Sequence, residues 1–413
     1  MSQRVLLVCY YFPPLGLGGV GRPLNLIKRL PQHGWDCHVL TVKPVLYRAY
    51  EPELLDGLDQ SRIFRSGSYD PQRLLYLLGV RKVKAQMISQ IRPVAEKFFP
   101  DSKIGWVGPA TRLGRSLHRE HNYAAVISTS PPVSAHLAGF RLSRALDLPW
   151  IADFRDFWTI YKPEEIYSDH DQLLRARQML ARFRDNADAL TAVNSSIVDF
   201  LGAGEVIPNG YDSQAAEHWR AAPSTDAFTI GLLGHQHDTR EIEPLLKLLQ
   251  RFQAERPDSH KCMRLLQVGE IDAAWLRARF NERGLEVSLD LRGRLSRDET
   301  IRALSGAHVF FLGISPKEGP GFLPGRTFEL IASGRQVLAY CRPDSEVARV
   351  VGQADNGLCF DDDSYPRAAE SLAAQFDAYA SGSYRYAPLS EYARQFSGDE
   401  LARRFAGLLN RLT

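Results

Sequence analysis

Short apolar runs alternate with amphipathic segments along most of the chain. In the first half these runs are VLLVCYY (5–11), CHVLTV (37–42), AAVISTS (124–130), PWIADF (149–154) and ADALTAV (187–193). In the second half they are FTIGLLG (228–234), RLLQVG (264–269), VSLDLRG (287–293), HVFFLGI (308–314) and QVLAYC (336–341). Strands that are covered on both faces of a parallel sheet read as continuous apolar runs. Their alternation with helical segments predicts a doubly wound, parallel α/β architecture.

The alternation is interrupted once, near the middle of the chain. Residues 206–228, VIPNGYDSQAAEHWRAAPSTDAF, hold Pro, Asn-Gly and Asp-Ser turn signals and end in a polar stretch. Because the pattern restarts after this segment, we expect two α/β domains, residues 1–210 and 211–385. The tail SGDELARRFAGLLNRL (397–412) has the spacing of an amphipathic helix.

Composition agrees with two soluble domains. The chain has 413 residues, of which 44% are hydrophobic and 24% charged, and a single core rarely grows that large. No apolar run reaches the roughly 18 residues of a membrane span, and we expect no signal peptide. The five cysteines form no Cys-x-x-Cys pair, which favours reduced thiols and a cytoplasmic location.

A glycine-rich loop follows the first apolar run. PPLGLGGVGRP (13–23) lies between a predicted strand and a predicted helix. The amides of Gly18 and Gly19 at a helix N-terminus, with Arg22 beside them, are suited to a phosphate or a sugar. A tight strand-to-helix turn is the alternative. A ribose-binding NAD site is disfavoured, because the second strand run is followed by Lys43 rather than by an acidic residue.

Several segments resemble glycosyltransferase family 4, which has the GT-B fold, and its branch that builds bacterial surface polysaccharides and glycolipids. They are YYFPPLGLGGVGRP, ISTSPPVSAHLAG, LPWIADFRDFW, ALTAVNSSIVDFL with VIPNGYD, GLLGHQHDTREIEPLL and PGRTFELIASGRQVLAY, in the order of that family. The resemblance implies two Rossmann-like domains that face each other across a cleft. It also implies that residues 386–413 form a C-terminal helix that crosses back to the first domain.

The resemblance implies that the second domain binds a nucleotide diphosphate sugar. In the family an Arg and a Lys, one and six residues after the glycine equivalent to Gly234, hold the diphosphate; here these positions are His235 and Arg240. The second Glu of the family's acidic pair corresponds to Glu329, which is expected at the ribose. The first has no match at its usual spacing, and Glu318, three residues too early, is the nearest carboxylate. The remaining donor candidates are Gly293 and Arg294, which lie where the base usually stacks in the family, and Gly325, Arg326 and Thr327.

On the acceptor side, the segment ADFRDFW supplies Asp153, Arg155 and Asp156. Arg155 stands where many family members carry a His near the sugar, and Asp153 or Asp156 is expected to orient the donor sugar or the acceptor. Together with Arg240 and Glu318 they complete the set of catalytic candidates. A structural Arg–Asp cluster at the end of a strand is the alternative for Asp153 and Asp156. His136 is a further candidate contact to the acceptor, and it could equally be an ordinary helix residue.

Charge is unevenly distributed, although the formal net charge is only +3. Residues 62–119 hold twelve Lys and Arg but three acidic residues. Acceptors of the resembled branch are often lipid-linked, so a basic helical stretch with Arg81, Lys82 and Lys84, followed by Trp106, is expected to contact an anionic membrane surface. A basic surface helix packed on the core is the alternative, and no motif supports a nucleic-acid partner.

The resemblance implies a retaining hexosyltransferase that moves a sugar from a nucleotide diphosphate sugar to a glycan, a glycolipid or another hydroxyl acceptor. No cofactor and no metal are expected, because His235 and His237 lack further ligands nearby in the sequence. Two alternatives remain open: a GT-B protein that binds a carbohydrate or nucleotide without catalysis, and a GT-B nucleotide-sugar epimerase.

Overall fold

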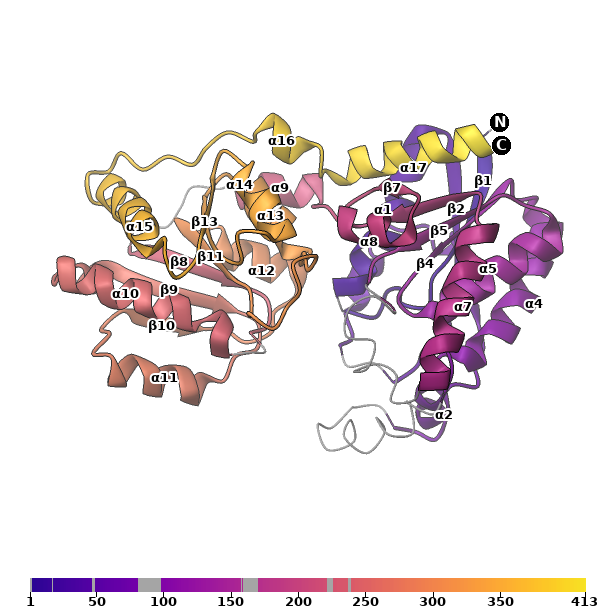
Figure 1. Ribbon diagram of the computed structural model, residues 1–413, viewed down its shortest axis with the longest axis horizontal. Helices are drawn as coiled ribbons and strands as arrows, with labels where there is room; N and C mark the ends of the chain where they lie inside the picture. The colour runs from indigo at the N-terminus through magenta and orange to yellow at the C-terminus, as the bar shows by residue number, and fades with distance from the viewer. Residues whose placement is uncertain are drawn as a thin grey trace. The chain divides into compact units, whose positions relative to one another are not determined.

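The computed structural model describes residues 2–16, 18–46, 49–80, 98–156, 158, 170–220, 226–236 and 239–413. Its contacts divide the chain into two compact units (Figure 1). Unit 1 comprises residues 1–209 and 398–413, and unit 2 comprises residues 210–397.

Unit 1 contains a seven-stranded sheet in the order β3-β2-β1-β4-β5-β6-β7, and all of its strand pairs are parallel. Its strands are β1 (Gln3–Val8), β2 (Trp35–Val42), β3 (Ile63–Ser66), β4 (Ala125–Thr129), β5 (Trp150–Phe154), β6 (Ala189–Ala192) and β7 (Glu205–Val206). Its α-helices are α1 (Gly21–Arg29), α2 (Pro71–Leu77), α4 (Ile104–His121), α5 (Val133–Leu146), α7 (His170–Asn186), α8 (Ser195–Leu201) and α17 (Gly398–Leu412).

Unit 2 contains a six-stranded sheet in the order β10-β9-β8-β11-β12-β13, again parallel throughout. Its strands are β8 (Phe228–Leu233), β9 (Met263–Val268), β10 (Ser288–Leu291), β11 (Val309–Gly313), β12 (Gln336–Tyr340) and β13 (Gly357–Phe360). Its α-helices are α9 (Ser213–Trp219), α10 (Glu243–Glu255), α11 (Ala273–Glu282), α12 (Arg297–Leu304), α13 (Arg326–Ala332), α14 (Glu346–Gly352), α15 (Tyr365–Ala380) and α16 (Glu391–Arg394).

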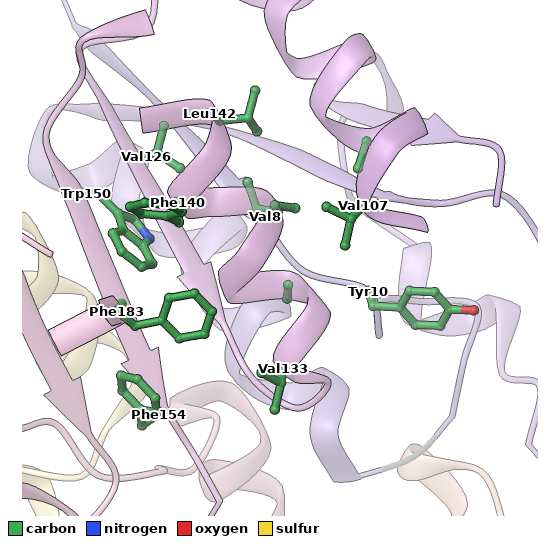
Figure 2. Close-up of a cluster of buried hydrophobic side chains, with 14 of the residues drawn as sticks. Val8, Tyr10, Val107, Val126, Val133, Phe140, Leu142, Trp150, Phe154 and Phe183 are labelled. Carbon is green, nitrogen blue, oxygen red and sulfur yellow. The ribbon is translucent and has the colours of Figure 1, made fainter. Parts of the chain in front are cut away.

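Each sheet separates two hydrophobic cores, because successive side chains of a strand point to opposite faces. In β1, Leu6 and Val8 belong to the core under α4, α5 and α7, whereas Val5 and Leu7 belong to the core under α1 and α17. Figure 2 shows the first of these cores, in which the rings of Phe140 and Trp150 lie 5.7 Å apart. Burial on both faces explains the continuous apolar runs, and the predicted doubly wound α/β class is confirmed.

The C-terminal helix α17 packs on unit 1, beside α1. Its apolar face, which includes Phe405 and Leu409, joins the core formed by β1, β2 and β4. The amide of Asn25 on α1 donates to the carbonyl of Gly398 at 3.0 Å, and the indole of Trp35 donates to Asn410 at 2.8 Å. The first and last segments of the chain therefore stabilise each other.

Candidate functional site

Four neighbouring strands of unit 2 lead at their carboxyl ends into glycine: Gly293 after β10, Gly269 after β9, Gly234 after β8 and Gly313 at the end of β11. A Cβ on Gly269 would lie 2.3 Å from the carbonyl oxygen of Gly234, and both residues have a positive φ. The loops that follow β8 and β9 therefore meet with no room for a side chain at Gly269. In doubly wound sheets ligands bind at the carboxyl ends of the strands, so this edge is the candidate site.

Arg326, the first residue of α13, crosses Gly234. A Cβ on Gly234 would lie 3.0 Å from Nη1 of Arg326. Nη1 donates to the carbonyl of His235 at 3.4 Å, and Nη2 lies 3.8 Å from Oε2 of Glu241. Among the residues that the structure describes, Nε has no hydrogen-bond partner. A guanidinium has five N–H donors, so this largely enclosed cation has spare donors for an anion.

Burial also acts on the charge of Arg326. Enclosure lowers the pKa of its guanidinium, and the carboxylate of Glu241 opposes that effect. The backbone of Glu241 packs against Gly313, since its carbonyl oxygen would lie 1.7 Å from a Cβ at that position. The 3-10 helix η5 (Thr239–Glu241) is thus seated directly on the end of β11. A bound anion would compensate the positive charge of Arg326, as the carboxylate of Glu241 does without a ligand.

His235 presents a neutral hydrogen-bond donor beside this cation. The backbone N–H of Glu270 donates to Nδ1 of His235 at 2.9 Å, and this contact places the ring proton on Nε2. Arg240, in η5, is exposed at the surface. The two expected phosphate contacts are therefore different in kind: His235 offers a fixed N–H group, and Arg240 offers a solvated guanidinium.

Further polar side chains at this edge keep unused hydrogen-bonding atoms. The amide of Gln267, a fully buried residue of β9, donates to the carbonyl of Gly234 at 2.7 Å. Its Oε1 atom and the hydroxyl of Thr327 have no partner within the described part of the chain. Buried polar atoms are usually paired, so their grouping around Gly234 and Arg326 points to a ligand.

Glu329 lies one turn after Arg326 on α13 and accepts a hydrogen bond from Nη2 of Arg297 at 3.2 Å. Gly293 and Arg294 lie in the loop between β10 and α12 that leads to Arg297, and the side chain of Arg294 is exposed. One ion pair thus links Glu329, the carboxylate expected at the ribose, to the helix that follows the loop expected beside the base.

Glu318 lies in the loop between β11 and α13. Its N–H donates to the carbonyl of Ser315 at 2.9 Å. The N–H of Glu346, on α14, donates to the carbonyl of Pro320 in the same loop at 2.7 Å. Gly325, the last residue of the loop, is exposed. Among the described residues no contact joins the carboxyl groups of Glu318 and Glu329, and the catalytic role of Glu318 stays a prediction.

In unit 1, Asp153 is completely buried and fully hydrogen-bonded. Arg22 donates to both carboxylate oxygens, at 2.8 and 2.6 Å, and the hydroxyls of Thr129 and Thr191 donate at 2.7 Å each. Arg22 also donates to the carbonyl of Pro208 at 2.7 Å. Both side chains are occupied in joining α1 to β4, β5 and β6. The geometry favours the structural Arg–Asp cluster for Asp153 and leaves no exposed face of Arg22 for an acceptor.

Arg155 fixes the glycine-rich loop rather than facing it freely. Its guanidinium donates to the carbonyls of Gly19, of Ser130 at 2.6 Å and of Pro131 at 3.4 Å. Gly18 and Gly19 lie in a 3-10 helix that leads into α1. Asp156, the next residue after Arg155, is exposed. Of the three candidates in ADFRDFW, Asp156 alone has an exposed side chain.

Two expectations for the acceptor side require correction. Trp106 is fully buried rather than exposed, because α4 turns it into the unit 1 core, where its ring meets that of Tyr10 edge-on. His136 is also fully buried, and its Nδ1 atom lies 2.8 Å from the hydroxyl of Ser128. Neither side chain is available to an acceptor or to a membrane. Arg81, Lys82 and Lys84 lie outside the described residues.

In the ranges the structure describes, no group of three His, Cys, Asp or Glu side chains could hold a metal ion; His237 lies outside those ranges. Within the same ranges, no helix combines the length and apolar character needed to cross a bilayer.

Sequence reasoning missed Glu241, Arg297, Gly269 and Gly313. The two glycines had a visible signal, because four successive predicted strands of the second half lead into Gly. Glu241 and Arg297 carried none, because each is an ordinary charged residue with a distant partner: Arg326 lies 85 positions from Glu241, and Glu329 lies 32 positions from Arg297.

No protein-family model matches the sequence, and no curated protein matches it. Solved structures do resemble it over their whole length. A glycosyltransferase from Rickettsia africae superposes with a TM-score of 0.64 at 13% identity, covering 100% of this chain and 98% of the other. Sucrose-phosphate synthase from Thermosynechococcus elongatus gives 0.60 at 15% identity, with 99% of both chains covered. HepE from Anabaena, in complex with UDP-glucose, gives 0.59 at 14% identity, covering 99% and 100%. With two parallel Rossmann-like units, the GT-B fold expected from the sequence is confirmed.

Proposed function

We propose that this protein is a glycosyltransferase that takes a sugar from a nucleoside diphosphate sugar and passes it to a hydroxyl acceptor. The observation that carries the proposal is Arg326, a largely enclosed cation at the glycine-lined edge of unit 2 whose Nε has no hydrogen-bond partner among the residues that the structure describes. A diphosphate satisfies such a group, because Arg presents a planar fork of donors that matches phosphate oxygens.

The chemistry that these residues would perform is stabilisation of the leaving group. Negative charge grows on the nucleoside diphosphate as the bond to the anomeric carbon breaks, and fixed donors at that position lower the barrier. Arg326, the Nε2–H group of His235 and Arg240 would supply those donors. Glu329 would accept the ribose hydroxyls, as the family resemblance implies.

The finer assignments are part of the same proposal. Membership of glycosyltransferase family 4 implies retention of anomeric configuration, with the leaving phosphate helping to deprotonate the acceptor. That mechanism needs no pair of catalytic carboxylates. The proposed acceptor is a glycan or lipid-linked sugar of a cell-surface polymer, and the proposed site of action is the cytoplasmic face of the membrane, without a metal cofactor.

The binding protein without catalysis remains the second candidate. It is favoured by the broken spacing between Glu318 and Glu329 and by His235 in place of the family's Arg. Both departures weaken contacts that the resembled family uses on the donor. Turnover decides between these two candidates.

The test is a product analysis by mass spectrometry. UDP-glucose is the first donor to supply, because the similar HepE structure was solved with it; GDP-, dTDP- and ADP-sugars follow, each with and without lipid-linked sugar diphosphates as acceptors. A nucleoside diphosphate together with a glycosylated acceptor is the expected result. An isomerised nucleotide sugar formed without acceptor would indicate the epimerase. A bound but unchanged nucleotide sugar would indicate the binding protein.

A further inference from the structure

The ion pair between Arg297 and Glu329 connects two helices that otherwise have separate roles. Arg297 is the first residue of α12 and Glu329 lies in α13, and Nη2 of Arg297 donates to Oε1 of Glu329 at 3.2 Å. The two side chains are 36% and 24% exposed. The pair is thus half open to solvent, as a group that also meets a ligand has to be.

Both ends of this pair are anchored. A capping box fixes the start of α12: the backbone N–H of Glu299 donates to the Ser296 hydroxyl oxygen, and the backbone N–H of Ser296 donates to the Glu299 carboxylate. On the same helix Leu304 is buried in the unit 2 core. On α13 the neighbours of Glu329, Phe328 and Leu330, are buried in that same core. The backbones at both ends are therefore held, and the hydrogen bond of 3.2 Å joins the two side chains between them.

The geometry leaves the other half of the carboxylate available. A carboxylate accepts about four hydrogen bonds, two on each oxygen. Arg297 uses one position on Oε1 and leaves Oε2 unoccupied by that guanidinium. A ribose presents two neighbouring hydroxyls, each of which donates one hydrogen bond. A carboxylate held in one rotamer can accept both at once, whereas a freely rotating one must first lose that freedom.

We propose that Arg297 is a positioning residue that sets the Glu329 carboxylate for the ribose diol and so makes the protein prefer ribonucleoside over 2′-deoxyribonucleoside diphosphates. This inference rests on the proposed function, in which the site takes a nucleoside diphosphate sugar. It adds a residue that the sequence patterns did not single out.

The loop before α12 connects the position expected beside the base to Arg297. Gly293 and Arg294, expected beside the base, precede Arg297 by four and three residues. The carbonyl of Gly293 accepts from the N–H of Gly269 at 2.6 Å, so this loop is tied to the same glycine-lined edge. A movement of the loop that holds Gly293 and Arg294 on binding of the base would therefore shift Arg297 and, with it, the carboxylate of Glu329.

The test compares affinities for ribo- and deoxyribonucleotides by titration calorimetry. UDP, GDP and ADP, their 2′-deoxy counterparts and inorganic pyrophosphate are titrated into the wild type, Arg297→Met, Arg297→Lys and the control Arg302→Met, which changes an exposed arginine on the same helix. We expect the wild type to prefer one ribonucleotide roughly tenfold over its deoxy form, the value of one hydrogen bond to a charged group.

Arg297→Met should abolish most of that preference and leave pyrophosphate binding unchanged, while Arg297→Lys should keep part of it and Arg302→Met all of it. The inference is overturned if Arg297→Met keeps the full preference, or if all ligands weaken equally, which would show a structural role only. A wild type that binds pyrophosphate and ribonucleotides without preferring ribose also overturns it. A wild type that binds none of these ligands contradicts the proposed function itself, and the inference fails with it.

Discussion

Arg326 passes over Gly234 so closely that a single added methyl group would crowd its guanidinium: the Cβ of an alanine at position 234 would lie 3.0 Å from Nη1, and the guanidinium would have to move by a few tenths of an ångström. Gly234 has a φ of +94°, a conformation that residues with side chains rarely adopt. The position of the enclosed cation therefore depends on a residue without a side chain at the end of β8.

Gly234→Ala should separate ligand binding from folding. We expect a loss of about 1–2 kcal/mol of unfolding free energy from the left-handed backbone. We also expect a weaker thermal stabilisation by nucleoside diphosphates, because the guanidinium of Arg326 has to shift away from the added methyl group. Melting temperatures with and without nucleotide measure both. Gly284→Ala, another positive-φ glycine with no atom close to the added Cβ, is the matched control and should lose stability while keeping the nucleotide response.

Glu241→Gln should strengthen anion binding. The carboxylate lies 3.8 Å from Nη2 of Arg326 and competes with a phosphate for the same cation. Removal of its charge should raise the affinity for pyrophosphate roughly fivefold, a modest Coulombic effect near the surface. Calorimetry measures the change, with Glu255→Gln on α10 as the control. A weaker affinity in Glu241→Gln would show instead that Glu241 holds Arg326 in its binding position.

Asp153→Asn should destabilise unit 1 strongly. The substitution leaves Arg22 buried, at 5% side-chain exposure, without its counter-charge, and breaking a buried pair costs about 3–5 kcal/mol. Chemical denaturation measures the loss. Asp185→Asn, in an exposed pair with Arg184, should change the unfolding free energy by less than about 0.5 kcal/mol. A small effect in Asp153→Asn would mean that the cluster is dispensable for folding and would revive the catalytic reading.

The carboxylate of Asp153 also makes a pH-dependent contribution to the free energy of unfolding. Burial raises the pKa of Asp153, but Arg22 and the two threonine hydroxyls outweigh it and leave the pKa below its ordinary value. A group whose folded pKa is lowered stabilises the fold above its unfolded pKa, near 4. That contribution should be present at neutral pH and disappear progressively as the pH falls below about 4.

His136→Gln should flatten the pH dependence of stability on the mildly acidic side. Burial lowers the pKa of His136 to about 3, so the folded protein keeps the ring neutral while the unfolded chain protonates it near pH 6.5. The wild type should therefore lose about 1 kcal/mol between pH 6.5 and 5.5 relative to the variant. Denaturation curves at the two pH values test this. Equal losses in both proteins would contradict a neutral, buried ring.

The sequence predicts most of the fold because each central strand carries its own signal. Runs such as Val5–Val8 are apolar at every position, since both faces of the strand are buried. The edge strands β3, β7 and β13 were not predicted. They have four, two and four residues, and several of these side chains are only partly buried, so they lack a continuous apolar run.

The candidate site was less predictable, because its contacts join distant residues. The motif around Gly234 and Arg326 marks the correct edge of the sheet, but nothing local shows that Glu241 faces Arg326 or that Arg297 holds Glu329. Arg22 and Asp153 are 131 residues apart and read equally well as catalytic or structural. Trp106 was misread for a similar reason: its burial is decided by the sheet under α4, not by its neighbours in the chain.

The most direct test of the central claim is a thermal-shift comparison of the wild type with Arg326→Met in the presence of UDP, GDP, dTDP, ADP and CMP. A ligand that binds the folded protein raises its melting temperature by mass action. The account predicts that at least one nucleoside diphosphate stabilises the wild type and that this stabilisation is lost in Arg326→Met, whose melting temperature without ligand stays close to that of the wild type. If no nucleotide stabilises the wild type, or if the same stabilisation persists in Arg326→Met, the proposed donor site is contradicted.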